Sequence, residues 1–128
     1  MRLLLDTCTF LWILSEPSKV PAATLEAFQS PTNEVYLSAA SAWEIALKCS
    51  IGKLPLPMDP VRFVPAQREA HGIRSLEITE EAALHQSRLP TLHRDPFDRL
   101  LVSQSIVQEL TLLTPDPLIT QYGCRTLW

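Results

Sequence analysis

Short apolar runs alternate along this chain with segments of helical pattern, and this alternation constrains the fold more than any other feature of the sequence. It is typical of α/β proteins, in which helices cover both faces of a mostly parallel sheet. The apolar runs predict strands at 2–5, 34–37, 73–78, 111–114 and 125–128, and the helical segments are 7–14, 21–29, 40–49, 60–70, 79–89, 96–106 and 117–122. We therefore expect a three-layer α/β/α sandwich around a central, mostly parallel sheet of about four to five strands.

The composition limits the class of protein. A chain of 128 residues has room for one hydrophobic core, so we expect a single domain over residues 1–128. The apolar runs are too short to span a bilayer, and Asp6 comes too early for the core of a signal peptide. We therefore expect a cytoplasmic protein that does not enter the membrane. The net charge of −3 argues against binding nucleic acid by bulk positive charge, but not against an enzyme that uses metal ions and a few local cations.

The segment from His93 to Ser105 predicts a helix that carries two carboxylates in its first turn. Asp95 occupies the N-cap position, and Pro96 follows at the first helical position, where a missing N–H costs nothing. Asp98 comes three residues after Asp95, so both project from the same end of the helix. The following apolar arc, Leu100, Leu101, Val102 and Ile106 among its members, is expected to face the core. A well-capped helix would by itself explain both aspartates.

Other carboxylates follow strands. Asp6 and Asp116 come directly after the first and fourth predicted strands, and Glu44 lies in the helix after the second. Ligands of open α/β sheets bind beyond the carboxyl ends of the strands, at the point where the strand order switches. If the first, second and fourth strands are neighbours, these carboxylates and Asp98 converge on one cleft. A surface ion pair of Glu44 with Lys48, four residues later, is the alternative for that glutamate.

Converging carboxylates need a compensating charge. Two of them about 4 Å apart repel by roughly 4 kcal/mol at an effective dielectric constant near 20. Hard divalent cations such as Mg²⁺ and Mn²⁺ prefer such oxygen ligands, and no cluster of His or Cys with zinc spacing competes. Carboxylate-held Mg²⁺ or Mn²⁺ suits hydrolysis of phosphodiesters, with one or two ions.

Five short motifs carry a family resemblance over essentially the whole chain. In chain order they are Leu3-Leu4-Leu5-Asp6-Thr7, Ser41-Ala42-Trp43-Glu44-Ile45, Gly52-Lys53-Leu54, the segment from His93 to Ser105, and Thr114-Pro115-Asp116. In this order they resemble PIN-domain proteins, and more narrowly the VapC-type toxins of bacterial and archaeal toxin–antitoxin pairs. The resemblance implies a metal-dependent endoribonuclease with an RNA substrate, a cognate antitoxin and a homodimeric state.

The resemblance also implies roles for individual residues. The catalytic, metal-holding carboxylates would be Asp6, Glu44, Asp98 and Asp116. Asp95 is then a helix cap or a residue just behind the ligands, and Thr7 and Thr114 have similar supporting positions. Candidate contacts to RNA phosphates, each equally compatible with a solvated surface, are Lys48, Lys53, Arg94 and Arg99, with His93 beside them. The family often has Asn where this chain has Cys8, which leaves the hydrogen bonding around Asp6 open.

Other readings of the acidic cluster fit the sequence less well. A HAD-type phosphatase would need a second aspartate at the position of Cys8. A receiver domain would need a lysine after its last strands, whereas the lysines here are Lys19, Lys48 and Lys53. A catalytically inactive PIN-like fold that binds RNA or protein remains the alternative. An inactive copy is expected to have lost acidic positions, and this chain keeps them.

Overall fold

The computed structural model describes residues 1–128 and contains one five-stranded sheet. Its strands are β1 (Arg2–Leu5), β2 (Glu34–Ser38), β3 (Arg74–Leu76), β4 (Thr111–Leu113) and β5 (Thr126–Leu127). They lie in the order β3-β2-β1-β4-β5, and every neighbouring pair is parallel. The predicted parallel sheet is therefore confirmed, and β1 lies between β2 and β4 as the converging carboxylates require.

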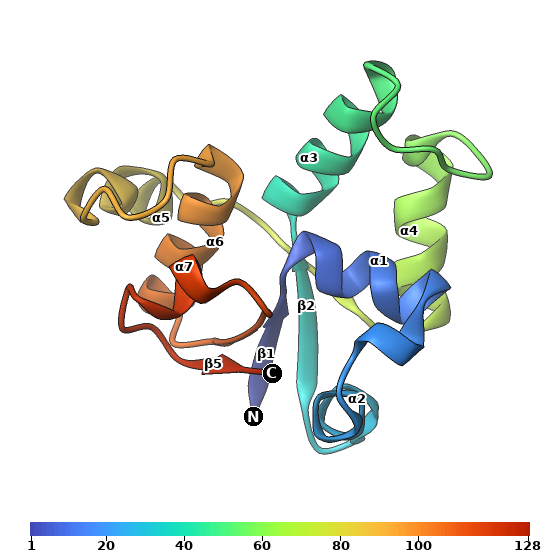
Figure 1. Cartoon of the computed structure of the whole chain (residues 1–128), viewed down its shortest axis with the longest axis horizontal. Coiled ribbons are helices and arrows are strands. Elements are labelled where there is room, and N and C mark those ends of the chain that lie inside the picture. The colour runs from blue at the N-terminus through green and yellow to red at the C-terminus, as the bar shows by residue number, and fades with distance from the viewer.

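Helices cover both faces of this sheet, which confirms the three-layer α/β/α architecture (Figure 1). They are α1 (Thr7–Ser15), α2 (Ala22–Gln29), α3 (Ala39–Ser50), α4 (Pro60–Ala70), α5 (Glu80–His85), α6 (Pro96–Val107) and α7 (Pro117–Thr120), with 3₁₀ turns η1 (Pro17–Lys19) and η2 (Gln86–Arg88). In Figure 1, α1, α2 and α4 lie on one side of β1 and β2, whereas α5, α6 and α7 lie on the other. None of these helices is both long and apolar enough to cross a membrane.

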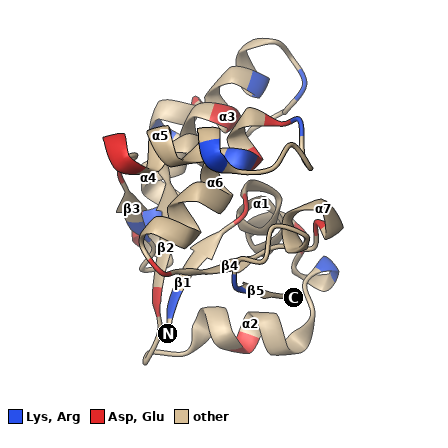
Figure 2. Cartoon of the chain, turned by 90° about the vertical axis from the view of Figure 1, so that its left-hand side faces the viewer, with Lys and Arg blue, Asp and Glu red and all other residues tan.

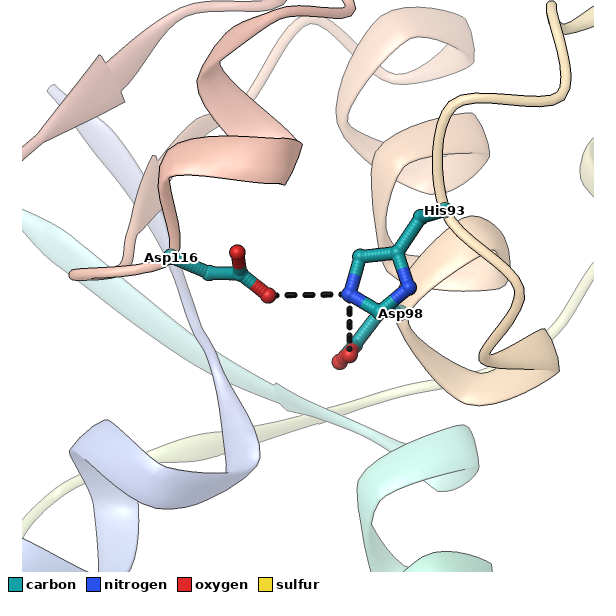
Figure 3. Close-up of side chains that lie close together, drawn as sticks. All are labelled: His93, Asp98 and Asp116. Atoms are coloured by element: carbon teal, nitrogen blue, oxygen red, sulfur yellow. Dashed lines mark hydrogen bonds and ion pairs between the residues drawn. The ribbon is translucent and has the colours of Figure 1, made fainter.

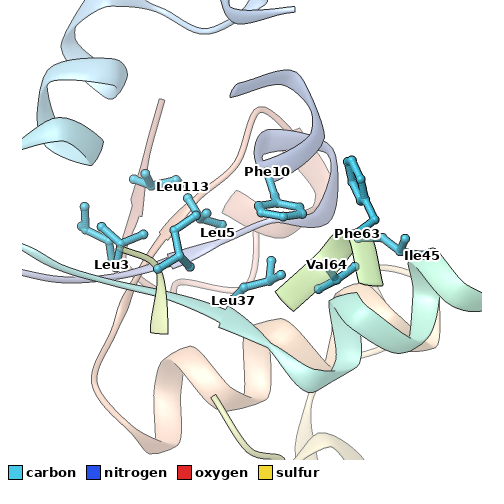
Figure 4. Close-up of a cluster of buried hydrophobic side chains, with 10 residues drawn as sticks. Leu3, Leu5, Phe10, Leu37, Ile45, Phe63, Val64 and Leu113 are labelled. Carbon is cyan, nitrogen blue, oxygen red and sulfur yellow. The ribbon is translucent and has the colours of Figure 1, made fainter. Parts of the chain in front are cut away.

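The core is divided by the sheet into two clusters, because successive side chains of a strand point to opposite faces. Leu3 and Leu5 of β1 pack against Phe10 of α1 and against α3 and α4, in the cluster drawn in Figure 4. Leu4 faces the other way and packs against α6 and α7, in a cluster that includes Leu101. Leu3, Leu4 and Leu5 of the central strand β1 are therefore fully buried, and the position of Asp6, which follows them, is fixed from both sides.

The main differences from the predicted elements are at their ends. The predicted helix 79–89 is α-helical only to His85 and continues as the 3₁₀ turn η2. The predicted strand 73–78 is hydrogen-bonded only over Arg74–Leu76. Helix α6 is buried continuously from Leu100 to Ser105, because the sheet covers one side and α5 packs against another. Ile106 was expected in the apolar arc of α6, but its side chain is exposed.

Candidate metal centre

The carboxyl ends of β1 and β4 open into a cavity of about 380 Å³, at the point where the strand order switches direction. Asp6 follows β1 directly, and Asp116 forms the N-cap of α7 just beyond β4. Glu44 extends from α3, and Asp98 from the first turn of α6. The cavity is lined by Asp6, Thr7, Cys8, Leu11, Glu44, Ile45, Lys48, Lys53, Leu54, Asp95, Asp98 and Asp116. The acidic residues singled out from the sequence thus lie around one cavity.

Asp6 is buried between β1 and β4. Its Oδ2 atom accepts a hydrogen bond of 2.6 Å from the Thr114 hydroxyl and a longer one, 3.6 Å, from the Cys8 thiol. The Thr114 hydroxyl oxygen in turn accepts the backbone N–H of Asp116 at 3.1 Å. Burial, with a smaller contribution from the charge of Glu44, raises the pKa of Asp6, and these hydrogen bonds oppose that rise. Thr114 therefore orients Asp6 and fixes the start of the turn that carries Asp116.

Glu44 combines the two alternatives drawn from the sequence. Its Oε2 atom makes the expected ion pair with Lys48, four residues along α3. The residue is nevertheless only 5% exposed, and its Oε1 atom is buried without a hydrogen-bond partner. A buried carboxylate oxygen without a partner is costly in a folded protein. This atom therefore needs a partner from outside the protein, such as a cation in the cavity.

Asp98 is a second carboxylate whose charge is disfavoured by burial. Burial raises its pKa to about 7, and the charges of Asp6, Asp95 and Glu44 add to this effect while His93 opposes it. Asp95 caps α6 as predicted, because its Oδ1 atom accepts the backbone N–H groups of Phe97 at 2.8 Å and Asp98 at 3.3 Å. A raised carboxyl pKa in a group of nearby carboxylates is the expected consequence of a missing counter-charge.

His93 joins the two remaining carboxylates (Figure 3). Its Nε2 atom lies 3.1 Å from Asp98 Oδ2 and 2.9 Å from Asp116 Oδ2. The other carboxylate oxygen of Asp116 accepts the backbone N–H of Leu118 at 2.9 Å and so caps α7. The sequence suggested His93 only as a residue flanking the cleft, and no periodic pattern could have placed it between two aspartates 18 residues apart in the chain.

The predicted basic residues lie in different surroundings. Lys48 and Lys53 line the cavity, and Arg94 is exposed and directly precedes Asp95 of the lining. Arg99 does not line the cavity, because its guanidinium donates to backbone oxygens and to Tyr122 within the protein. Figure 2 shows blue and red segments interspersed along the ribbon on the side that it presents. Positive charge near the carboxylates is thus supplied locally by the two lysines.

Thr7 supports the site from the N-terminal end of α1. Its hydroxyl donates a hydrogen bond of 2.9 Å to the Ser41 hydroxyl, and both residues are buried. Ser41 belongs to α3, the helix that carries Glu44. This bond therefore ties the helix after Asp6 to the helix of Glu44 and sets the spacing between the two carboxylates.

The donor set fits a hard divalent cation. The acidic side chains around the cavity offer oxygen ligands, two of them have raised carboxyl pKa values, and the Oε1 atom of Glu44 is unpartnered. A cation of charge +2 would offset the repulsion and give this oxygen a partner. Mg²⁺ and Mn²⁺ are the ions that such oxygen ligands favour. His93, Asp98 and Asp116 also bring three ligand-type atoms within 4.8 Å of one another.

Solved structures with a similar fold include chains of VapBC and Fit complexes. The chain is similar to one in VapBC-1 of nontypeable Haemophilus influenzae, with a TM-score of 0.70, 15% identity and coverage of 99% of this chain and 97% of that one. It is also similar to one in VapBC2 of Rickettsia felis bound to a promoter DNA fragment, with a TM-score of 0.69, 15% identity and coverage of 99% and 98%. A chain of FitAcB from Neisseria gonorrhoeae gives a TM-score of 0.62 at 20% identity, covering 98% and 96%. At these identities the likeness concerns the fold.

Sequence comparison adds a curated relative and a family. Ribonuclease VapC16 of Mycobacterium tuberculosis is 38% identical over 58 residues, which are 45% of this chain and 41% of that protein. The matched part thus spans less than half the length of this relative. The family model of the PIN domain matches residues 3–123, nearly the whole chain. The chain therefore belongs to the PIN domain family.

Proposed function

We propose that this protein is a divalent-metal-dependent endoribonuclease that acts as the toxin of a toxin–antitoxin pair. The observation that carries the proposal is the buried, unpartnered Oε1 atom of Glu44, in a cavity that Asp6, Asp98 and Asp116 also line. Repulsion among these carboxylates and a buried oxygen without a partner are both costly, so a binding module with no use for a metal ion would have no need to keep them. The PIN family match and the ribonuclease activity in the name of the curated relative support the reaction class.

In the proposed reaction, the carboxylates Asp6, Glu44, Asp98 and Asp116 hold one or two Mg²⁺ or Mn²⁺ ions. The bound cation supplies Lewis acidity, which activates water and offsets the negative charge that develops on the phosphodiester. Thr114 keeps Asp6 in one orientation through its hydroxyl, and Asp95 fixes the first turn of α6 that carries Asp98. Phosphodiester hydrolysis depends mainly on such positioning and charge compensation, which rigid elements supply well.

RNA would reach the carboxylates alongside Lys48 and Lys53. Both line the cavity, and hydrogen bonding to Glu44 raises the pKa of the Lys48 ammonium group, which keeps it charged at neutral pH. Arg94 adds an exposed cation one residue from His93. Because the overall charge is −3, binding would depend on these local contacts to phosphates rather than on a basic face.

A protein partner is part of the proposal. The structural neighbours from Haemophilus influenzae and Rickettsia felis are VapBC complexes, which supports a cognate antitoxin for this chain. Large apolar side chains are exposed on α3 and α4, where Trp43 is 58% and Val61 78% exposed. Exposed apolar groups of this size favour protein–protein contact, either with the antitoxin or within a homodimer. A toxin that cleaves cellular RNA would act in the cytoplasm.

Cleavage of a mixed RNA pool by purified, antitoxin-free protein tests the activity. Cleavage should require Mg²⁺ or Mn²⁺, stop with EDTA and be lost in Asp98→Asn. The matched control is Asp59→Asn, which changes an exposed helix cap outside the cavity and should cleave like the wild type. Metal-independent cleavage, or full activity of Asp98→Asn, would refute the proposal. Absence of cleavage by folded protein that also fails to bind either ion in calorimetry would favour the binding-module alternative.

A further inference from the structure

The hydrogen bonds of His93 define which of its ring nitrogens carries the proton. The backbone N–H of Asp95 points at His93 Nδ1 over 3.1 Å, and a backbone N–H can only donate. Nδ1 therefore accepts, and in a neutral imidazole the proton is on Nε2. That N–H donates to Asp116 Oδ2 at 2.9 Å, and Asp98 Oδ2 lies 3.1 Å from the same nitrogen, within ion-pair distance. His93 is thus a hydrogen-bond donor to Asp116, and the same nitrogen is in close contact with Asp98.

This arrangement argues against His93 as a metal ligand itself. A histidine that binds a metal through Nε2 uses the lone pair there, and it donates its other ring N–H to an acceptor. Here the atom facing Nδ1 is a donor, the backbone nitrogen of Asp95, so a proton on Nδ1 would face another proton. The close approach of Nε2 to Asp116 therefore reflects hydrogen bonding, and Nε2 is not an additional metal ligand.

The position of His93 is itself fixed from α6 and from the turn after α7. The backbone N–H of His93 donates to the Tyr122 hydroxyl at 2.8 Å, and Arg99 Nη1 donates to the same oxygen at 3.2 Å. The guanidinium of Arg99 also donates to the backbone oxygens of Pro90 at 2.9 Å and Gln86 at 2.8 Å. Arg99 and Tyr122 therefore hold both ends of the segment that leads into His93.

We propose that His93 is a positioning residue whose Nε2–H holds Asp98 and Asp116 together, so that both are in place for the cation. This inference deepens the proposed function and rests on it. Both carboxylate oxygens lie within 3.1 Å of one nitrogen, so without the N–H their repulsion would drive the side chains apart. Removing a residue that hydrogen-bonds to a metal ligand typically lowers metal affinity by about 10- to 100-fold, and we expect a loss of that size when the N–H of His93 is removed.

Calorimetric titration of variants with Mn²⁺ distinguishes the effect of the His93 N–H donor from the effect of its ring. His93→Phe keeps a ring but removes the donor, and it should weaken Mn²⁺ binding by about 10-fold or more. His93→Gln places an amide N–H near the position of Nε2 and should restore most of the affinity. His71→Phe, an exposed histidine far from the cavity, is the matched control and should bind like the wild type. Equal or tighter binding by His93→Phe would overturn the proposal, because the N–H of His93 would then not help to place the carboxylates for the cation.

Nitrogen NMR of the imidazole tests the same inference without any activity. With ¹⁵N-labelled histidine, the metal-free protein should show His93 with its proton on Nε2, and adding Mg²⁺ should leave that proton in place. A ligand-type shift of Nε2 on adding Mg²⁺, or a proton on Nδ1 before it, would overturn the proposal. If the wild type bound neither cation, the proposed function would fail. Even then, a proton on Nε2, together with carboxyl ¹³C shifts of Asp98 and Asp116 that change in His93→Phe, would support the positioning of both carboxylates by His93.

Discussion

Replacing Asp98 with Asn should stabilise the metal-free protein, and the gain should grow with pH. The folded protein holds a proton on Asp98 with a pKa of about 7, against an ordinary value of 3.8. Ionising this buried carboxyl therefore costs more in the folded than in the unfolded state, by about 4 kcal/mol in total from the 1.36 kcal/mol that each pKa unit represents. The side chain is 16% exposed, so solvent screening reduces this cost little.

The sign of the pH dependence follows from the raised pKa. The stability of the wild type should fall as the pH rises from about 4 to about 7 and level off above, because the unfolded chain releases the proton first. Asp98→Asn lacks this ionisation. Its advantage over the wild type should therefore be about 3 kcal/mol larger at pH 8 than at pH 5.

Urea denaturation at pH 5 and pH 8 measures how the stability difference between Asp98→Asn and the wild type changes with pH. EDTA is included because a bound cation would offset the charge of Asp98. Asp59→Asn, which changes an exposed helix cap, should show no such pH-dependent gain. An advantage of Asp98→Asn that is equal at pH 5 and pH 8, or a destabilised variant at pH 8, would refute the electrostatic reasoning.

Three further predictions concern the other groups of the site. Thr114→Val removes the donor to Asp6 and should lower the free energy of unfolding by about 1–3 kcal/mol in urea titrations, whereas Thr114→Ser should restore it. Glu44→Gln should keep the fold by circular dichroism but lose Mn²⁺ binding by calorimetry, since the unpartnered oxygen is no longer charged. The double variant Lys48→Gln/Lys53→Gln should weaken RNA binding in filter assays. The slope of log binding constant against log salt concentration should become shallower by about 0.7 per phosphate contact removed, and an unchanged slope would mean that the lysines make no such contact.

The strands could be predicted because their signal is local, whereas their order entered the sequence analysis only as a condition for the carboxylates to converge. The run Arg2–Leu5 is almost wholly apolar and ends at Asp6, so it reads as a buried strand with a carboxylate at its carboxyl end. The cap at Asp95 followed by Pro96 fixed the start of α6 to the residue. The ends of the third strand and of α5 were less well placed, because hydrogen bonding across the sheet and packing on α6 decide them.

The candidate site was predictable only in part, because some of its residues are placed by contacts between distant parts of the chain. Acidic residues after strands could be assigned to one cleft from topology, because parallel strands bring their carboxyl ends to one edge. His93 and Tyr122 lie in irregular segments, and their positions depend on contacts between residues distant in the chain. Arg99 looked like a cation for RNA, but three acceptors inside the protein take up its guanidinium. No local pattern encodes such pairings.

The claim that the carboxylate cavity holds a divalent cation is tested most directly by anomalous X-ray diffraction from crystals grown with Mn²⁺. We expect a manganese peak inside the cavity, with Asp6, Glu44 and Asp98 oxygens at about 2.0–2.3 Å from it. In the Asp98→Asn protein under the same conditions, the peak should weaken strongly or disappear. A wild-type cavity without a peak at millimolar Mn²⁺, or manganese bound only elsewhere on the surface, would show that the carboxylates do not form a metal site.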